Sequence, residues 1–440
     1  RGEGGGVKGK VAMASPPAPA PVSQAEVAVR ASLAPSNGKD APAAAPAPTP
    51  AAPPPSVAPK RKAEPTPAAA RDGATQLKRP KRRAAVKFPP AVQDRIEKLK
   101  HRIERDKYDG EAWEQLLSEL KHKPQGGDAI EVLRQVHAEM RDVFPTSAIA
   151  WRGAVEAELS PGGDPEEAKR LFGECLFQCK SIELWRTYIK YVKRTNDASS
   201  PHGLNEIKGA YEFTLDQLGT DIQSGPLWME YVQWLQQANP AVMFGESHPG
   251  QEESVRLMQI RRAYKRALTI PTHSLEQMWR DFDKFENGVN RTLARQILGE
   301  MQSRFGQVKQ AYRELKKKWE GIKPLSLAVP PAEGKPWPLA RQHLLWSRLI
   351  RHECANPLKL EPEALVPRVS LVYSQCLLCL RHCPEMWYQY ASWHAGEGRE
   401  QEASAVFQEA RAALPGCTVL HFAAADFEAS VGNVEAGKAI

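Results

Sequence analysis

The chain has 440 residues, of which 42% are hydrophobic, enough for a large buried core. Residues 1–88 carry 15 of the 60 basic and 5 of the 52 acidic residues, so this tail has a charge of +10 and the remainder −2, which argues against a bulk basic surface for binding phosphates. The sequence shows neither a signal-peptide pattern in its first 35 residues nor an apolar run of about 18 residues, so neither secretion nor membrane insertion is expected.

The N-terminal tail, residues 1–88, holds 16 of the 37 prolines and no Trp or Tyr. Such a segment buries too little apolar surface to offset its chain entropy, so we expect it to be disordered. Short basic runs in an extended segment are typical of nuclear-import signals, although weak RNA contact or a merely solubilising role would also fit. The residues of the predicted import signal are Lys60, Arg61, Lys62, Lys78, Arg79, Lys81, Arg82 and Arg83.

The stretch 181–221 has the clearest periodicity in the chain. Trp185, Tyr188 and Tyr191 lie at i, i+3 and i+6, which places the three rings on one face of a helix. A polar break and a second amphipathic run, 204–218, follow. The pattern predicts a helical hairpin that must still bury its apolar faces against neighbours.

The neighbours are further copies of the same pattern. The spacing is 34 residues from Trp151 to Trp185 and again from Trp387 to His421, a period typical of tetratricopeptide-like solenoids. Helical periodicity points the rings into the hairpins, so core packing is preferred over stacking on RNA bases. The predicted packing residues are Trp113, Trp151, Trp185, Tyr188, Trp228, Tyr231, Trp279, Phe282, Trp346, Trp387 and Tyr390, and His421 takes the Trp position of a degraded eighth copy.

These copies divide into two predicted arms. Residues 89–320 form an N-terminal arm of about five repeats plus an extra helix, with separate helices expected over 291–302 and 307–320. Five prolines and two glycines in 321–338 indicate a hinge, and 339–440 begin a C-terminal arm. Because a solenoid needs a polar terminal cap and none is visible, we expect this second arm to be truncated.

An acidic residue recurs seven positions after the Trp position. A carboxylate on this face would be partly buried and would need donors, so we expect each one to bond an Arg, a Tyr hydroxyl or a Trp N–H across the seam between repeats. No partner His or nucleophile recurs at a fixed spacing, which disfavours catalysis. These predicted seam carboxylates are Glu158, Glu286, Glu353 and Glu428.

Common catalytic and nucleotide-binding motifs are absent from the sequence, so no enzymatic activity and no cofactor are predicted. Seven cysteines in helical runs suggest a reducing compartment. The cluster Cys376, Cys379, Cys383 and His382 resembles a zinc site, but its spacing on one helix favours buried structural thiols, so no metal is predicted.

A first helix of the form W-x-x-Y/F-x-x-F/W-E, paired with a second helix that ends at proline, resembles the HAT (half-a-TPR) repeat of RNA-processing proteins. Within that group the chain resembles the suppressor-of-forked family, which includes the large HAT-repeat subunit of cleavage stimulation factor. The strings that carry this resemblance are 143–147 leading to Trp151, 171–176 leading to 184–188, and 270–273 leading to 276–282 and 285–286.

The resemblance implies an all-α solenoid of HAT (TPR-like) helix-turn-helix repeats that serves as a nuclear scaffold in pre-mRNA 3′-end cleavage and polyadenylation. It also implies partners: an RNA-recognition-motif subunit, a WD-repeat subunit, the polyadenylation specificity factor and, through the C-terminal arm, a second copy. Pre-mRNA would be contacted mainly indirectly. A crooked-neck-type splicing scaffold and a direct RNA-binding module that uses the tail and the 316–318 face remain alternatives. The spacings of 43, 51 and 67 residues between Trp185 and Trp346 fit a crooked-neck protein less well.

Overall fold

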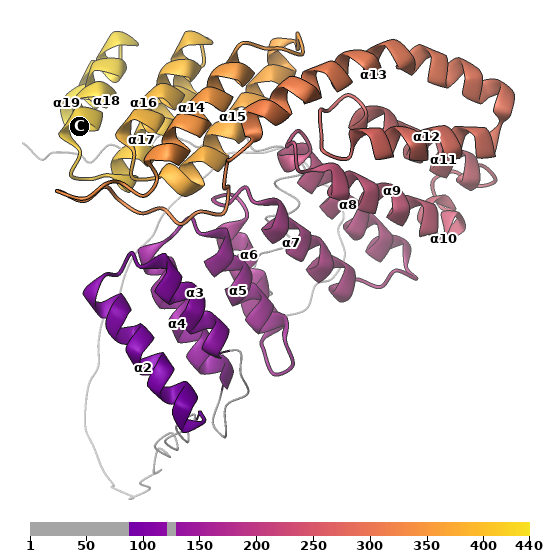
Figure 1. Ribbon diagram of the computed structural model, residues 1–440. Coiled ribbons are helices and arrows are strands. Elements are labelled where there is room, and N and C mark those ends of the chain that lie inside the picture. The colour runs from indigo at the N-terminus through magenta and orange to yellow at the C-terminus, as the bar shows by residue number, and fades with distance from the viewer. Residues whose placement is uncertain (1–87, 121–128) are drawn as a thin grey trace, which may run out of the picture.

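The computed structural model describes residues 88–120 and 129–440, and all the regular structure in these two ranges is helical, with no strand (Figure 1). The all-α prediction is therefore confirmed. The helices are α2 (Pro90–Arg105), α3 (Gly110–Leu120), α4 (Ala129–Val143), α5 (Ala148–Leu159), α6 (Pro165–Cys175), α7 (Ile182–Thr195), α8 (Pro201–Leu218), α9 (Gly225–Gln237), α10 (Pro240–Phe244), α11 (Glu252–Ala267), α12 (Leu275–Val289), α13 (Arg291–Trp319), α14 (Ala340–Cys354), α15 (Pro362–Leu380), α16 (Pro384–Gly396), α17 (Glu400–Ala413), α18 (Thr418–Ser430) and α19 (Val434–Ala439).

The helices pack as successive antiparallel pairs, each the helical hairpin of one repeat. The pairs are α3–α4, α5–α6, α7–α8, α9–α11, α12–α13, α14–α15, α16–α17 and α18–α19, with α2 packed on α3 and the short α10 inserted between α9 and α11. We call the two members the first and second helix of a repeat. We call the contact between one repeat's second helix and the next repeat's first helix a seam.

Local sequence signals begin several of these helices. Asp164 accepts from the backbone N–H of Glu166 at the start of α6, and Pro165 occupies the first helical position. The turn before it includes Gly162 at φ +94°, in the left-handed region that glycine enters without strain. Ser200 caps α8 in the same way through the N–H of Gly203. Capping therefore fixes where these second helices start.

Helix α13 corrects one prediction. Instead of two helices with a break near 303–306, residues Arg291–Trp319 form one continuous helix of 29 residues. Its buried face explains the continuity, because Val308 belongs to the core of the N-terminal arm and Leu315 to the core of the C-terminal arm. The supposed extra helix is therefore the second half of the fifth repeat's second helix.

The two arms are packed against each other. In Figure 1 the row of helices α14–α19 lies across the end of the fan formed by α2–α9. Leu371 and Leu378 of α15 are buried in the N-terminal core, and Ile222, between α8 and α9, is buried in the C-terminal core. Leu327, in the segment between α13 and α14, is buried in a third core built around α2–α5. The Pro-rich segment 321–338 thus contacts the N-terminal arm.

Helix α15 is the most enclosed element of the interface. Among the described helices it alone has the length and hydropathy of a membrane span, and 61% of that stretch is buried inside the protein. It contacts α14, α16 and, in the other arm, α8. Its apolar composition is therefore that of a central core helix.

Candidate functional site

The recurring Trp makes a hydrogen bond as well as filling a core. In four repeats the indole N–H donates to the backbone carbonyl six residues earlier, in the turn that precedes the helix. The pairs are Trp113 to Lys107 (2.9 Å), Trp151 to Pro145 (2.7 Å), Trp185 to Cys179 (3.0 Å) and Trp387 to Arg381 (2.8 Å). His421 keeps this geometry, with its Nε2 at 3.2 Å from the Pro415 carbonyl oxygen. In these five repeats the residue at the Trp position thus fixes the turn into the repeat.

Three repeats depart from that arrangement. Trp228 donates to the carbonyl of Gly219, nine residues earlier, because the preceding turn is longer. Trp346 is fully buried, and its indole packs edge-on against Trp319. Trp279 is only half-buried and stacks on Phe305 with ring centroids 4.4 Å apart, while its neighbour Met278 is buried. In the fifth repeat the indole therefore lies at the edge of the core, although Phe282, three residues later, is fully buried.

The aromatic residues three positions later pair across the seams. Each ring meets a ring from the second helix of the preceding repeat, at centroid separations of 4.6–5.4 Å. The pairs are Tyr188 with Phe172, Tyr231 with Tyr211, Phe282 with Tyr264, and Tyr390 with Tyr373. These rings are occupied by one another, which leaves them unsuited to stacking on bases.

Three of the four seam carboxylates bond across a seam. Arg134 of α4 donates from Nε and Nη2 to both oxygens of Glu158 in α5, at 2.6 and 2.7 Å. Arg261 of α11 does the same to Glu286 in α12, at 2.6 and 2.8 Å. At the last seam, Glu428 accepts from the hydroxyl of Ser404 instead. The donor lies 24 or 25 residues before the acid in each case, a spacing at which the two helices of a seam face each other.

Glu353 is bonded within its own hairpin. Arg368 of α15 donates to both carboxylate oxygens of Glu353, and both side chains are almost fully buried. The same guanidinium donates from Nη1 to the carbonyl of Thr220, in the loop between α8 and α9. Glu353 therefore orients an arginine that joins the two arms.

Further polar contacts join α15 to the loops between repeats of the N-terminal arm. Thr146 Oγ1 donates to the Leu378 carbonyl at 2.9 Å, and Gln375 Nε2 donates to the Lys180 carbonyl at 3.3 Å and to the carboxylate of Asp221. Sequence reasoning missed these residues because they do not recur from repeat to repeat. A usable signal was the presence of Arg368 and Gln375 seven residues apart in a helix that is mostly apolar.

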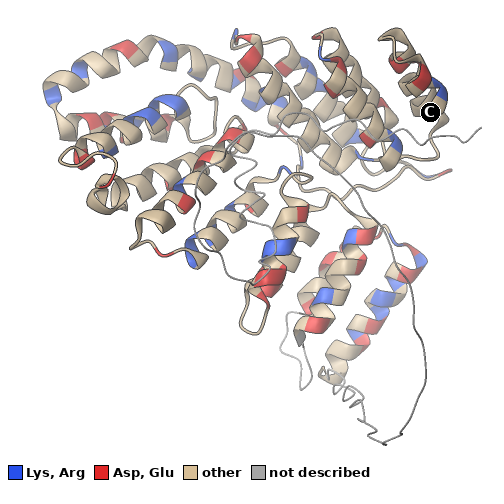
Figure 2. Cartoon of the chain, turned by 180° about the vertical axis from the view of Figure 1, so that it is seen from behind, with Lys and Arg blue, Asp and Glu red and all other residues tan. Residues whose placement is uncertain are grey.

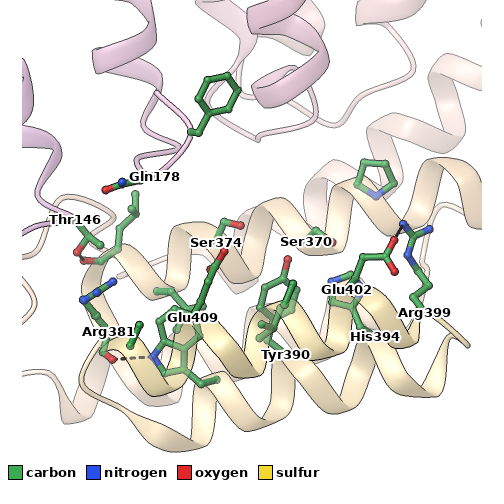
Figure 3. Close-up of a pocket in the computed structure, with 18 of the residues that line it drawn as sticks. Thr146, Gln178, Ser370, Ser374, Arg381, Tyr390, His394, Arg399, Glu402 and Glu409 are labelled. Carbon is green, nitrogen blue, oxygen red and sulfur yellow. Dashed lines mark hydrogen bonds and ion pairs between the residues drawn. The ribbon is translucent and has the colours of Figure 1, made fainter. Parts of the chain in front are cut away.

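A cleft of about 720 Å³ opens where the two arms meet, and we call it the inter-arm cleft. Figure 3 shows Ser370 and Ser374 of α15 with Tyr390 and His394 of α16 and Glu402 and Glu409 of α17, while Thr146 and Gln178 come from the loops of the other arm. Hydroxyl, amide and carboxyl groups thus lie beside aromatic rings. Such a surface can bind a polar segment through hydrogen bonds and aromatic contact.

Desolvation by neighbouring groups controls ionisation in this cleft. It raises the pKa of Glu409, an exposed residue, above its ordinary value, although the nearby Arg381 opposes this rise. It lowers the pKa of His394 to about 4 and also lowers the pKa of Arg381. The imidazole of His394 is therefore neutral at physiological pH.

Two basic helix faces, one on α11 and one at the end of α13, carry ion pairs with acidic residues. Figure 2 shows basic and acidic residues interspersed along most of the described helices. On α11, Arg256 bonds Glu253 and Arg266 bonds Asp216. On α13, Lys317 bonds Glu314. Paired charges of this kind are weak binders of phosphate.

The cysteine cluster does not assemble as a unit. Cys376 and Cys379 are buried inside α15, where burial raises the pKa of the Cys379 thiol to about 12. Cys383 lies beyond the end of α15, near His343 and Glu385. His382 instead packs its ring edge-on against Tyr108. The basic clusters proposed as an import signal, Lys60–Lys62 and Lys78–Arg83, lie outside the described residues.

Comparison with known proteins places this architecture. A 35% identical relative is the cleavage stimulation factor subunit 77 of Arabidopsis thaliana, matched over 76% of this chain and 43% of the relative. The protein suppressor of forked of Drosophila melanogaster is 30% identical over 67% of this chain and 37% of its own length. The mRNA 3′-end-processing protein rna14 of Schizosaccharomyces pombe is 29% identical over 78% of this chain and 45% of its own length.

The chain thus spans less than half of the length of these curated relatives. A solved structure described as the crystal structure of CstF-77 aligns with 62% of this chain and 60% of that chain, at 21% identity and a TM-score of 0.45. The model of the suppressor of forked protein family matches residues 94–440, which include all of the repeats described above. On this match, the chain belongs to the suppressor of forked protein family.

Proposed function

We propose that the chain is a scaffold of the nuclear machinery that cleaves and polyadenylates pre-mRNA 3′ ends. The observation that carries the proposal is the family match over 94–440, together with relatives named as mRNA 3′-end-processing proteins. Two packed arms of helical repeats offer broad surfaces that hold partners at a fixed separation. The family match and the names of these relatives favour a role in 3′-end processing over a crooked-neck-type splicing role.

The partners proposed are an RNA-recognition-motif subunit, a WD-repeat subunit and the polyadenylation specificity factor. The test is quantitative mass spectrometry of proteins that co-purify from nuclear extract with the tagged chain. The control is Trp185→Ala, which opens a cavity in the third repeat. We expect enrichment of 3′-end-processing subunits with the parent chain and their loss with the variant. Enrichment of splicing factors alone would overturn the proposal.

A second copy of the chain is also a proposed partner. Four large side chains are exposed on the first helices of the last three repeats: Leu344 on α14, Tyr388 on α16, and Val419 and Phe422 on α18. Exposed apolar patches of this kind mark interaction surfaces. Light scattering of the parent should give a dimer and that of Phe422→Asp a monomer, while Met258→Asp, a matched exposed site on α11, should leave the dimer intact. A monomeric parent would rule out this dimer.

The proposed location is the nucleus, carried by the two basic clusters of the tail. A fluorescent fusion of the whole chain should concentrate in nuclei. Replacing Lys78, Arg79, Lys81, Arg82 and Arg83 with Ala should redistribute it to the cytoplasm. An unchanged distribution would show that import depends on another segment or on a partner.

Direct RNA binding is the second candidate, supported by the exposed lysines at the end of α13. Filter binding of residues 89–440 at increasing salt distinguishes the two roles. Because residues 89–440 have a net charge near zero and several basic side chains of α11 and α13 are paired with acids, we expect weak binding. Tight binding with a steep salt dependence would reverse the ranking.

A further inference from the structure

Three side chains able to bind a metal meet between the sixth and seventh repeats. His343 lies in the first turn of α14, Cys383 is the residue before α16, and Glu385 lies in the first turn of α16. Their ligand atoms all lie within 4.8 Å of one another. Among the described residues, this is the one group of His, Cys, Asp or Glu that gathers so closely.

The imidazole of His343 supplies an independent observation. Its Nε2 is buried and has no hydrogen-bond partner, although the Oε2 of Glu385 lies 3.1 Å away. The 3.1 Å separation is within ion-pair distance of the exposed Glu385 carboxylate, and it also suits two ligands of a shared cation. The ring is held in place beside Trp337, with centroids 6.2 Å apart. Buried polar atoms without partners are uncommon, so this nitrogen calls for a ligand.

The donor set indicates which ion would fit. One imidazole nitrogen, one thiolate sulfur and one carboxylate oxygen form a mixed set that suits Zn²⁺. Three protein ligands leave a fourth tetrahedral position for water. When the ion binds, the Cys383 thiol loses its proton to solvent, and the two negative charges of the thiolate and the carboxylate balance Zn²⁺.

We propose that His343, Cys383 and Glu385 form a zinc site that joins the first helices of the sixth and seventh repeats. The site shares only Cys383 with the cysteine cluster considered in the sequence, because Cys376 and Cys379 remain buried along α15. It adds a metal crosslink between α14 and α16, which the hydrogen bonds of the repeat pattern do not provide.

The next repeat offers a matched control. Cys417 is the residue before α18, just as Cys383 is the residue before α16. The two cysteines are 34 residues apart. The positions that correspond to His343 and Glu385 in that repeat are Pro384 and Val419, which cannot bind a metal. A thiol in the same local structure therefore lacks the other two ligands.

The experiment titrates Co²⁺ and then Zn²⁺ into the metal-free full chain, with absorption spectroscopy and calorimetry as readouts. We expect one ion per chain, a sulfur-to-cobalt charge-transfer band, and displacement of Co²⁺ by Zn²⁺. Cys383→Ser should abolish the band, and His343→Gln should weaken binding by about tenfold or more. Cys417→Ser should change neither.

Circular dichroism of each metal-free variant separates loss of the site from loss of the fold. Variants that keep the parent's helicity and lose the ion support the proposal. A parent chain without a charge-transfer band would overturn it, as would unchanged affinity in the folded His343→Gln variant. Loss of the band in Cys417→Ser would also overturn it, because the thiolate ligand would then lie elsewhere.

Discussion

Arg368 and Glu353 form a two-pronged ion pair, with Nε and Nη2 of the arginine at 2.6 and 2.9 Å from the two carboxylate oxygens. Both side chains are buried, and the third nitrogen of the guanidinium reaches the Thr220 carbonyl of the other arm. This ion pair within the α14–α15 hairpin thus positions Arg368 for a contact between the two arms. Neither residue would be expected to tolerate the loss of the other.

Replacing Arg368 with Met should destabilise the chain by about 3–5 kcal/mol, because it leaves the Glu353 carboxylate buried without a partner. Chemical denaturation measures the loss, and hydrogen exchange of residues 219–224 should rise. Arg170→Met, which removes an exposed pair with Glu167, should cost less than about 1 kcal/mol. If the double variant Arg368→Met, Glu353→Leu were no more stable than Arg368→Met alone, the buried charge would not be the cause.

Replacing Trp185 with Phe should cost about 1–3 kcal/mol, since it removes the indole donor and leaves the buried Cys179 carbonyl unsatisfied. The same change at Trp279 should cost less, because that indole is half-buried and stacked on Phe305. Thermal unfolding of the two variants compares them directly. Equal losses would contradict the role assigned to the indole hydrogen bond.

Two carboxyl groups should give stability changes of opposite sign with pH. Hydrogen bonds from Arg134 lower the pKa of Glu158, so its stabilisation is present above the unfolded value of about 4.5 and is lost as pH falls through the folded value. Desolvation by its neighbours raises the pKa of Glu409, whose side chain is exposed, so the folded state loses a small amount of stability as pH rises from about 4.5 through that raised value.

Glu158→Gln should therefore destabilise the chain at pH 7, whereas Glu409→Gln should stabilise it. Both differences should shrink toward pH 4, where the carboxyl group of Glu409 is protonated and that of Glu158 is losing its advantage. Denaturant titrations at several pH values provide the measurement. The same sign for both variants at pH 7 would refute the assignment.

The continuity of α13 can be tested at Gly306. A Cβ at this position would meet no atom within 4 Å, so Gly306→Ala should stabilise the helix by about 0.5–1 kcal/mol. Gly153→Ala is the contrasting case, since its Cβ would lie 2.4 Å from the buried ring of His137, and it should destabilise. A loss of stability in Gly306→Ala would indicate a real break at 303–306.

Periodicity predicted the features that repeat. The Trp position and the carboxylate seven residues later belong to each hairpin or seam, so a single sequence shows them several times over. The donors to these carboxylates could not be predicted from the periodicity. Arg134 and Arg261 lie 24 and 25 residues before Glu158 and Glu286 in other helices, and only the packing of the repeats brings each arginine next to its acid. The hydrogen bond of the indole N–H to the carbonyl six residues earlier was likewise hidden in backbone geometry.

Features that occur once were missed. Separate helices were expected over 291–302 and 307–320, but α13 is continuous and buries Val308 and Leu315. The contacts of Arg368 and Gln375 with Thr220 and Asp221 join residues about 150 positions apart, and no local pattern announces such pairs. The prolines of 321–338 suggested a hinge, whereas Leu327 is buried against the first repeats.

The unbroken α13 has a mechanical consequence. At 1.5 Å per residue, a helix of 29 residues is about 44 Å long. It packs against α12 within the fifth repeat and against α14 of the next repeat. Because α15 follows α14 and contacts α8 of the other arm, α13 is one member of a closed ring of packed helices. A closed ring of packed helices resists bending at any single helix contact, so a force applied to the first repeats is transmitted to the last ones.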